Sequence, residues 1–412
     1  MVNEVLRTEL PDEWEALSLG VHSQIFRGGS PRPIQEFLTT SDTGVNWIKI
    51  GDVDADAKYI TATEEKIIPE GVSRSRMVYE GDLILSNSMS YGRPYITNIQ
   101  GCIHDGWLVI QKYDKAFDRD YLYYALSSNL TMQQYIAMAA GSSVQNLNKE
   151  KVAKVVLPKP EIPEQKKIAE ILSDADVLIT DLQKLIRKKK DIRQGTMQML
   201  VTGKNRLDGF TGDWITQPLE KLCDLITDGS HESPSEYLDG FYMPSVKDMT
   251  DSGFDFSDCK RISKADYERL VANGCKPEIG DVLIAKDGSM LKYVFPVKEN
   301  RNIVILSSIA ILRPKNNMLS SSYLTYYFRQ PCFVEQVIKS NQTGTGVPRI
   351  VLKNIKKIEL RIPEKLNEQE AIAGILSDMD IDIWTLEKKL KKLMAIKQGM
   401  MEELLTGKVR LV

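Results

Sequence analysis

The chain repeats itself at a long period. Ile168-Ala169 recurs as Ile372-Ala373, 204 residues later, and Thr202-Gly203-Lys204 recurs as Thr406-Gly407-Lys408 at the same spacing. A long internal period indicates two similar structural units in one chain. The length of 412 residues is enough for two or three domains, each with its own core. We therefore expect a protein that does one job at two places.

Two segments have the pattern of long helices. The first begins near Glu164 after three prolines, and the second begins after Pro363. Each runs for roughly 38 residues, or about 57 Å. The apolar residues at alternating four- and three-residue steps are Ile168, Leu172, Ala175, Ile179, Leu182 and Ile186, then Ile372, Leu376, Met379, Ile383, Leu386, Leu390 and Leu393. Ile171, Leu178, Leu185 and Ile192 widen the first stripe every seven residues.

Such a stripe either faces a globular core or forms a seam between two helices. Its length and narrowness favour the seam, and the two helices are each other's obvious partners. The first helix leads from one globular unit to the other, so a second helix packed along it runs antiparallel. Gly203 and Gly407 are natural C-terminal stops.

The remaining sequence forms two mixed α/β units with many short strands. The segments Gly81–Leu85 and Gly280–Ile284 are matched turn-then-strand pairs, and Tyr121-Leu122 matches Tyr323-Leu324 at the start of helices. We predict two similar domains of mixed α/β (α+β) class, separated by a long antiparallel two-helix coiled coil with pseudo-twofold symmetry. The expected boundaries are 1–160 for the first domain, 161–207 for the first helix, 208–363 for the second domain and 364–412 for the second helix.

Catalytic and metal-binding patterns are weak in this sequence. The three histidines are not spaced for a metal or a catalytic triad. Gly203-Lys204 and Gly407-Lys408 lack the Ser or Thr that a phosphate-binding loop requires. The sequence predicts no catalytic residue and no metal site.

Composition indicates where such a chain works. The five cysteines form no C-x-x-C pair, which favours a reducing compartment. No secretory signal and no membrane-length apolar run occurs, so we expect a cytoplasmic protein. The formal net charge of −2 argues against a protein that coats nucleic acid by bulk electrostatics, although a local basic groove remains compatible with it.

Three polar loops supported by glycines recur in each half. Their Ser, Asn, Gln, Lys and Arg side chains suit phosphates and base edges. The candidate DNA-binding residues are Arg27, Ser30, Arg32, Asn87, Ser88, Tyr91, Arg93, Gln145 and Asn146 in the first half, and Ser230, His231, Lys286, Ser289, Thr343, Thr345 and Arg349 in the second. For each loop taken singly, ordinary turn chemistry is an equal alternative. Recurrence in both halves, with different polar residues at similar places, favours recognition.

Lysines are concentrated on both long helices. Arg187-Lys188-Lys189-Lys190 lies on the first, and Lys388-Lys389, Lys391-Lys392 and Lys397 lie on the second. The simpler interpretation is a solvated coiled-coil face. The alternative is a patch near the DNA backbone or a docking face for a partner.

Together these residues resemble the DNA-specificity subunits of type I restriction–modification systems over essentially the whole chain. The most specific similarities are the helix starts Glu164–Ala169 and Glu368–Ala373, the helix ends Leu200–Leu207 and Leu404–Leu411, and the loop Thr343–Ile350. The first half departs from this loop pattern at Ala140–Leu147, which weakens the DNA-binding assignment there.

The resemblance implies a non-catalytic, sequence-specific DNA-binding subunit. It would read an asymmetric bipartite site on double-stranded DNA, one domain per half. It would scaffold modification subunits, which methylate adenine N6 with S-adenosylmethionine, and restriction subunits that use ATP. The chain itself would bind no cofactor, because S-adenosylmethionine, ATP and Mg²⁺ belong to the partners. Two alternatives are a nucleic-acid enzyme with an unrecognised carboxylate centre and a free-standing DNA-binding regulator.

Overall fold

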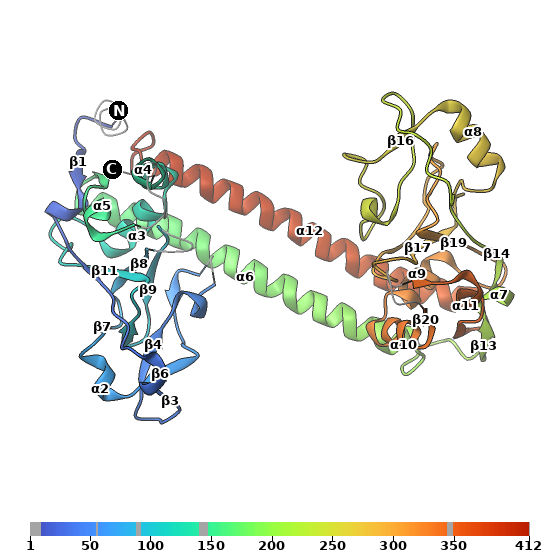
Figure 1. Ribbon diagram of the computed structural model, residues 1–412, viewed down its shortest axis with the longest axis horizontal. Coiled ribbons are helices and arrows are strands. Elements are labelled where there is room, and N and C mark those ends of the chain that lie inside the picture. Colours follow the sequence, from blue (N-terminus) through green and yellow to red (C-terminus); the bar gives the residue numbers. More distant parts are fainter. Residues whose placement is uncertain (1–9, 55–56, 88–91, 140–146, 344–348, 412) are drawn as a thin grey trace. The chain divides into compact units, whose positions relative to one another are not determined.

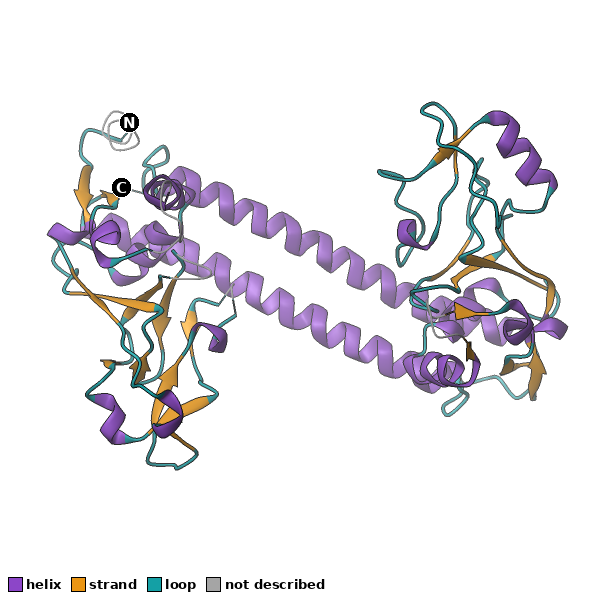
Figure 2. Cartoon of the chain, viewed as in Figure 1, coloured by secondary structure: helices purple, strands orange, loops and turns teal. Residues whose placement is uncertain are grey.

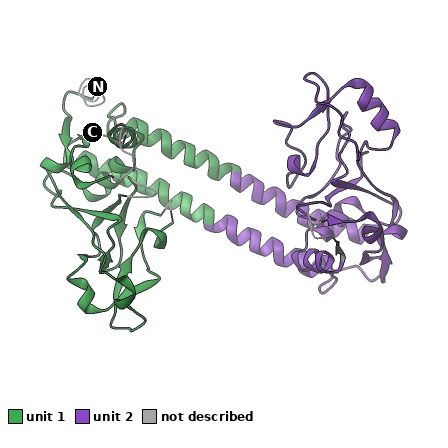
Figure 3. Cartoon of the chain, viewed as in Figure 1, with its two compact units in different colours: residues 1–183, 388–412 green, residues 184–387 purple. Residues whose placement is uncertain are grey.

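The computed structural model describes residues 10–54, 57–87, 92–139, 147–343 and 349–411. The chain divides into two compact units, residues 1–183 with 388–412 (unit 1) and residues 184–387 (unit 2), as Figure 3 shows. Helix α6 (Ile162–Val201) begins in unit 1 and ends in unit 2, whereas α12 (Leu366–Leu404) begins in unit 2 and ends in unit 1. Each unit therefore contains the start of one long helix and the end of the other.

In the part of unit 1 that the structure describes there are two five-stranded sheets and one two-stranded sheet, and Figure 1 labels their strands. The first sheet has the order β2 (Gln24–Arg27), β11 (Trp107–Gln111), β8 (Leu83–Ser86), β9 (Pro94–Thr97), β5 (Tyr59–Ile60). The second has the order β3 (Leu38–Thr39), β6 (Glu65–Ile67), β4 (Val45–Ile48), β10 (Gly101–Ile103), β7 (Arg76–Val78). The pair is β1 (Glu15–Ser18) with β12 (Val156–Lys159). The short helices are α2 (Pro69–Val72), α3 (Arg119–Ser127), α4 (Asn129–Ala139) and α5 (Lys149–Ala153), with 3₁₀ turns η1 (Leu19–Val21), η2 (Ile34–Glu36) and η3 (Ile50–Asp52).

Within its described residues, unit 2 has one four-stranded sheet and three strand pairs. Figure 2 shows the strands in orange and the helices in purple. The sheet has the order β14 (Cys223–Asp228), β19 (Ile309–Pro314), β17 (Val282–Ala285), β18 (Val294–Pro296). The pairs are β13 (Trp214–Pro218) with β22 (Glu359–Pro363), β15 (Phe241–Tyr242) with β16 (Arg261–Ile262), and β20 (Gln342–Thr343) with β21 (Arg349–Ile350). Its helices are α7 (Leu219–Leu222), α8 (Lys264–Ala272), α9 (Ser321–Phe328), α10 (Pro331–Asn341) and α11 (Leu352–Lys356), with the 3₁₀ turn η4 (Val246–Asp248).

The two units share a common framework. The pair β1–β12 corresponds to β13–β22, the strands β2, β11, β8 and β9 correspond to β14, β19, β17 and β18, and α3, α4 and α5 correspond to α9, α10 and α11. The N-caps agree in kind, because Asp118 accepts hydrogen bonds from the first turn of α3 and Ser320 does so for α9. The predicted fold class, two similar mixed α/β domains with long helices, is confirmed.

Strands β8 and β17 are buried throughout and apolar apart from Ser86 at the end of β8, because both of their faces are covered. In β8, Leu83 and Leu85 pack in a core with α3 and the long helices, whereas Ile84 packs in a separate core with β10 and β11. In β17, Val282 and Ile284 belong to the helix-side core, and Leu283 belongs to the core on the other face. The alternation follows from the period of two residues in a strand.

Inside each unit the two long helices pack antiparallel. In unit 1 the start of α6, with Ile168 and Leu172, shares a core with the end of α12, with Leu404. In unit 2 the end of α6 shares a core with the start of α12. Gly203 and Gly407 follow the helix ends with φ of 68° and 74°, the left-handed conformation that favours glycine.

The predicted seam and its extension differ in burial. Ile168, Leu172, Ala175, Leu182 and Ile186 of the seam are buried. Ile171, Leu178, Leu185 and Ile192 are instead exposed, together with Met199 at the next seven-residue step. These five residues, which we call the α6 stripe, form a second apolar row that the helix partner does not cover.

Part of the lysine run serves the helix pair. In unit 2, Lys189 lies 3.0 Å from Asp382 and Lys190 lies 2.7 Å from Glu387. These are solvent-exposed ion pairs between neighbouring helices, as the simpler interpretation of the run predicts.

Among the described residues, no helix is long and apolar enough to cross a membrane.

Candidate nucleic-acid interface

The three predicted loops of unit 2 meet at one end of its sheet. Asp228 ends β14, Lys286 follows β17, and Arg349 begins β21. The Ile350 N–H donates to the Lys286 carbonyl at 2.9 Å, and Asp287 forms an isolated bridge with Arg349. Backbone pairing therefore brings segments that are far apart in the sequence into one cluster.

Two of the corresponding loops of unit 1, those that carry Arg27 and Asn87, meet around Asp105, which lies between β10 and β11. The Arg27 Nε donates to the Asp105 carbonyl at 2.9 Å, and the Ser30 hydroxyl donates to its carboxylate at 2.8 Å. The Arg32 guanidinium lies 3.5 Å from the same carboxylate, and the Asn87 amide donates to the Asp105 carbonyl at 3.1 Å. Asp105 thus orients four of the predicted DNA-binding residues.

The strand registers show which residues are equivalent. Arg27 stands opposite Leu108 of β11, and Asp228 stands opposite Ala310 of β19. One residue beyond β8, the Asn87 N–H donates to the Gly106 carbonyl at 2.9 Å. One residue beyond β17, the Lys286 N–H donates to the Ser308 carbonyl at 3.0 Å. Arg27 therefore corresponds to Asp228, and Asn87 corresponds to Lys286.

Two glycines of these loops serve the backbone. A Cβ on Gly28 would lie 2.1 Å from the His104 carbonyl oxygen, and a Cβ on Gly229 would lie 2.0 Å from the Ile305 carbonyl oxygen. Both distances are far below van der Waals contact, so neither position accepts a side chain. The glycines thus follow ordinary turn chemistry, and the side chains beside them are available to differ between the units.

Charge around Asp105 favours its ionised form. Burial by itself would raise the pKa of Asp105, but the Ser30 hydrogen bond and the charges of His104 and Arg27 outweigh it. The pKa of this carboxyl is therefore lowered, and Asp105 remains an anion that holds the exposed Arg27 and Arg32 in place.

In unit 2 the equivalent position is more enclosed. The Lys286 ammonium is buried and lies 3.3 Å from both Asp228 and Asp287. His231 is exposed, with its Nε2 3.4 Å from Asp228. The Ser230 hydroxyl donates to the Glu232 carbonyl and also accepts from the Glu232 N–H. Lys286 and Ser230 thus have partners within the protein.

The other predicted site residues are placed as follows. Arg93 and Arg349 are exposed, and Ser289 is half-buried in the loop after β17. The backbone of Thr343 pairs with that of Arg349. Ser88, Tyr91, Gln145, Asn146 and Thr345 lie outside the described residues. Sequence reasoning missed Asp105, whose Asp-Gly pair signals only a turn, and it missed Asp228 and Asp287 as partners of Lys286.

The residues at the helix starts fix each long helix to its unit. Glu164 accepts two hydrogen bonds from Arg410, at 2.8 and 2.9 Å, and one from the Trp14 indole. Glu368 accepts two from Arg206, at 2.9 and 2.7 Å. The end of each long helix is therefore tied to the start of the other, and Arg410 and the Leu411 N–H both bond Glu164.

The glutamines that follow these glutamates have one shared role. The Gln165 side chain accepts from the Asp118 N–H and donates to the Ala116 and Pro160 carbonyls. The Gln369 side chain accepts from the Ser320 N–H and donates to the Met318 and Pro363 carbonyls. Both are fully buried with three hydrogen bonds each, so they lock the long helix against the N-terminus of α3 or α9.

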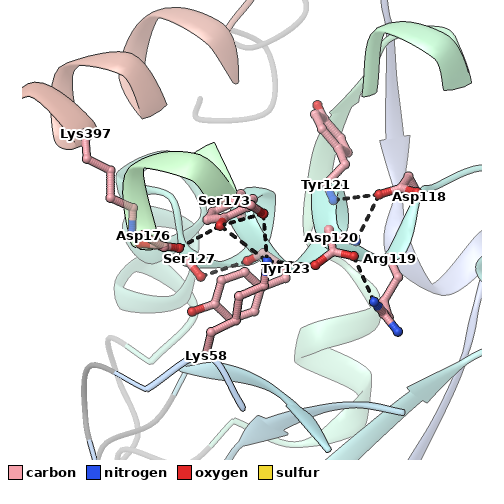
Figure 4. Close-up of polar contacts among 11 residues, drawn as sticks. Lys58, Asp118, Arg119, Asp120, Tyr121, Tyr123, Ser127, Ser173, Asp176 and Lys397 are labelled. Carbon is pink, nitrogen blue, oxygen red and sulfur yellow. Dashed lines mark hydrogen bonds and ion pairs between the residues drawn. The ribbon is translucent and has the colours of Figure 1, made fainter. Parts of the chain in front are cut away.

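A polar network links the domain of unit 1 to both long helices (Figure 4). The Lys58 ammonium lies 2.7 Å from Asp120 and donates to Ser173 at 3.0 Å. The Tyr124 hydroxyl donates to Asp176 of α6 at 2.6 Å, and Asp176 lies 2.5 Å from Lys397 of α12. Burial and the bond to Asp176 raise the pKa of Tyr124 well above its usual value, so it remains a neutral donor.

Unit 2 repeats this network with other residues. The Tyr326 hydroxyl donates to Asp380 at 2.9 Å, and Arg193 of α6 also bonds Asp380 at 2.9 Å. Arg329 supplies the second cation, 3.8 Å from Asp380. Both units thus join a domain tyrosine, a helix aspartate and a cation of the neighbouring helix.

Among the described residues, no cluster of three or more His, Cys, Asp or Glu could hold a metal ion.

Comparisons with known proteins agree with this architecture. The family model of the type I restriction modification DNA specificity domain matches residues 11–193 and 245–395. The chain is 23% identical to the MjaVIII specificity subunit of Methanocaldococcus jannaschii, over 97% of this chain and 94% of that protein. It is 22% identical to the EcoBI specificity subunit of Escherichia coli, over 97% and 86%.

Solved structures show the same fold. The crystal structure of the type I restriction–modification S subunit from M. genitalium has a TM-score of 0.58 at 15% identity, covering 96% of each chain. A chain solved in work on complex assembly and conformational transition of the type I system has a TM-score of 0.60 at 17% identity, covering 97% of this chain and 99% of that one. With the family model matching most of its length, the chain belongs to the type I restriction–modification DNA-specificity family.

Proposed function

We propose that this chain is the specificity subunit of a type I restriction–modification complex and reads an asymmetric, bipartite site on double-stranded DNA. One observation carries the proposal beyond the family itself. At equivalent places on a shared framework, the two units present different side chains, Arg27 against Asp228 and Asn87 against Lys286. Equivalent backbones with different side chains in these loops suit two different short DNA elements, one per unit.

The exposed side chains of the clusters suit contacts with duplex DNA. Arg27, Arg32 and Arg93 in unit 1 and Arg349 in unit 2 are exposed. A guanidinium binds guanine O6 and N7 or a phosphate through two parallel N–H donors. The formal net charge of −2 means that the whole protein does not attract DNA strongly, so local clusters and partner subunits must supply the grip.

Methylation and cleavage belong to partners in this proposal. Modification subunits with S-adenosylmethionine methylate adenine N6, and restriction subunits with ATP and Mg²⁺ act on the DNA, all in the cytoplasm. The α6 stripe supports docking of the modification subunit on the long helices, because each of its five residues is at least 38% exposed. Apolar side chains at seven-residue steps suit a partner helix packed alongside α6.

Reconstitution tests this division of labour. The purified chain is incubated with duplex DNA, Mg²⁺ and S-adenosylmethionine, alone and with the modification subunit of the same system. We expect no methyl transfer and no cleavage by the chain alone, and methylation at defined sites when both are present. Methylation or cleavage by the chain alone would instead indicate an enzyme with its own carboxylate centre.

A further inference from the structure

Two arginines outside the predicted loops lie beside the Asp105 cluster. The Arg76 Nε donates to the Arg27 carbonyl at 3.0 Å, and its guanidinium lies 4.6 Å from the centre of the Phe26 ring. The Arg74 guanidinium lies 5.1 Å from the centre of the Phe37 ring. The Arg74 carbonyl oxygen would lie 2.9 Å from a Cβ on Gly29. The segment that leads into β7 therefore packs directly against the loop that carries Arg27 and Arg32.

The result is a surface rich in guanidinium groups, which we call the arginine cluster: Arg27, Arg32, Arg74 and Arg76. Asp105 is the carboxylate that Arg27 and Arg32 share, at 4.0 and 3.5 Å. Within the described residues, neither Arg74 nor Arg76 makes an ion pair. Stacking on an aromatic face holds a guanidinium in place while leaving its in-plane N–H donors available.

In the equivalent part of unit 2, Arg349 is exposed, but the other positions carry an aspartate or a paired cation. Asp228 stands where unit 1 has Arg27, and the buried Lys286 is neutralised by Asp228 and Asp287. Arg269 is paired with both Glu232 and Asp266. The two units therefore share a backbone framework and differ in the charge that they present.

From this asymmetry we propose that the arginine cluster is a phosphate clamp, in which Arg74 and Arg76 bind the DNA backbone next to the bases that the first domain reads. The inference rests on the proposed function and adds two residues to it. It also makes the first domain the main source of electrostatic affinity. Four guanidiniums spread over two chain segments, two of them without a carboxylate, match the spaced charges of a strand of phosphates better than a single base edge.

Salt dependence separates a phosphate-binding side chain from a base-reading one. Removal of one side chain that neutralises a phosphate makes the slope of log K against log salt shallower by about 0.9. The affinity of this chain, in complex with its modification subunit, is measured by titration at several salt concentrations. One duplex contains the motif that the complex methylates, and the other has an unrelated sequence. The variants are R74A/R76A, the charge-preserving R74K/R76K, and R361A. Arg361, over the Trp214 ring at 5.6 Å in β22, is a matched arginine outside the cluster.

For R74A/R76A we expect roughly tenfold or greater weakening of affinity at low salt on both duplexes, and a slope shallower by about 2. R74K/R76K should retain most of the slope, and R361A should behave as wild type. An unchanged slope in a folded R74A/R76A complex, or a weakening confined to one base pair of the motif, would overturn the clamp. Those results leave the specificity function standing, whereas a wild-type complex without any preferred DNA sequence would refute the function itself.

Discussion

Glu164 is a single residue on which the attachment of α6 depends. It is almost fully buried, and its carboxylate is shared by Arg410, Trp14 and the Leu411 N–H. Burial alone would raise the pKa of Glu164, but these hydrogen bonds and the charge of Arg410 lower it overall. The Glu164 carboxylate therefore links the start of α6 to the segment that follows α12 and to Trp14, which precedes β1.

This shift predicts acid sensitivity. The folded pKa of Glu164 lies below its unfolded value of about 4.3, so its stabilisation is present above that pH and is lost as the pH falls through the folded pKa. Glu164→Gln should lower the melting temperature at pH 7 and approach wild type in acid. Thermal unfolding between pH 3 and pH 7 measures this, with the exposed Glu170→Gln as control. A constant difference between wild type and Glu164→Gln at every pH would contradict the assignment.

The sequence did not predict which polar side chains of the candidate site are buried or which partners they bond. Lys286 and Ser230 have the residue types of DNA donors, yet internal partners occupy both. Conversely, Asp105 accepts hydrogen bonds from Ser30 and Asn87 in the unit 1 cluster, although its sequence context indicates only a turn. Which polar side chain is buried depends on contacts between distant segments, and a single sequence does not encode those contacts locally.

The sequence predicted the secondary-structure elements better than it predicted the contacts of individual side chains. The heptad steps predicted the long helices and their pairing, and the recurrence of Thr-Gly-Lys predicted their ends. The recurring loops also converge in the described parts of both units. The Tyr124 and Tyr326 networks were not predicted, because tyrosines at a helix start are more often simple core residues.

The Tyr124 network makes a testable contribution to the docking of α3 on α6. Tyr124→Phe removes a hydroxyl that lies 2.6 Å from Asp176 and 3.1 Å from Ser173, so it leaves a partly buried carboxylate with fewer partners. We expect a decrease of about 1–3 kcal/mol in the free energy of unfolding, measured by chemical denaturation. Because both residues belong to one network, Tyr124→Phe and Asp176→Asn should be non-additive. Fully additive effects would show that the hydroxyl and the carboxylate act independently.

Two glycines of α12 and its terminus should respond oppositely to alanine. Gly407 has φ of 74°, and a Cβ there would lie 2.6 Å from Pro11, so Gly407→Ala should destabilise by at least about 1–2 kcal/mol. Gly399 lies inside α12 with nothing within 4 Å of its Cβ position, so Gly399→Ala should stabilise by up to about 1 kcal/mol. Denaturation midpoints of both variants check this pair. Equal effects of the same sign would contradict the C-terminal stop.

At the scale of the whole molecule, the two units share a backbone framework but differ in their loop side chains. The backbone framework, the helix-start Glu-Gln pairs and the tyrosine–aspartate networks recur in both units. The exposed loop residues do not recur, and at the strand end an arginine is replaced by an aspartate. A protein that read the same element twice would have no physical reason for this difference in charge.

Sequencing of methylated bases in the genome of a host that carries this system tests the central claim most directly. We expect methylated adenines in one motif with two different defined elements separated by unspecified base pairs, and disappearance of that motif when this gene is disrupted. A palindromic or uninterrupted motif, or a methylation pattern that does not change without this chain, would contradict the account.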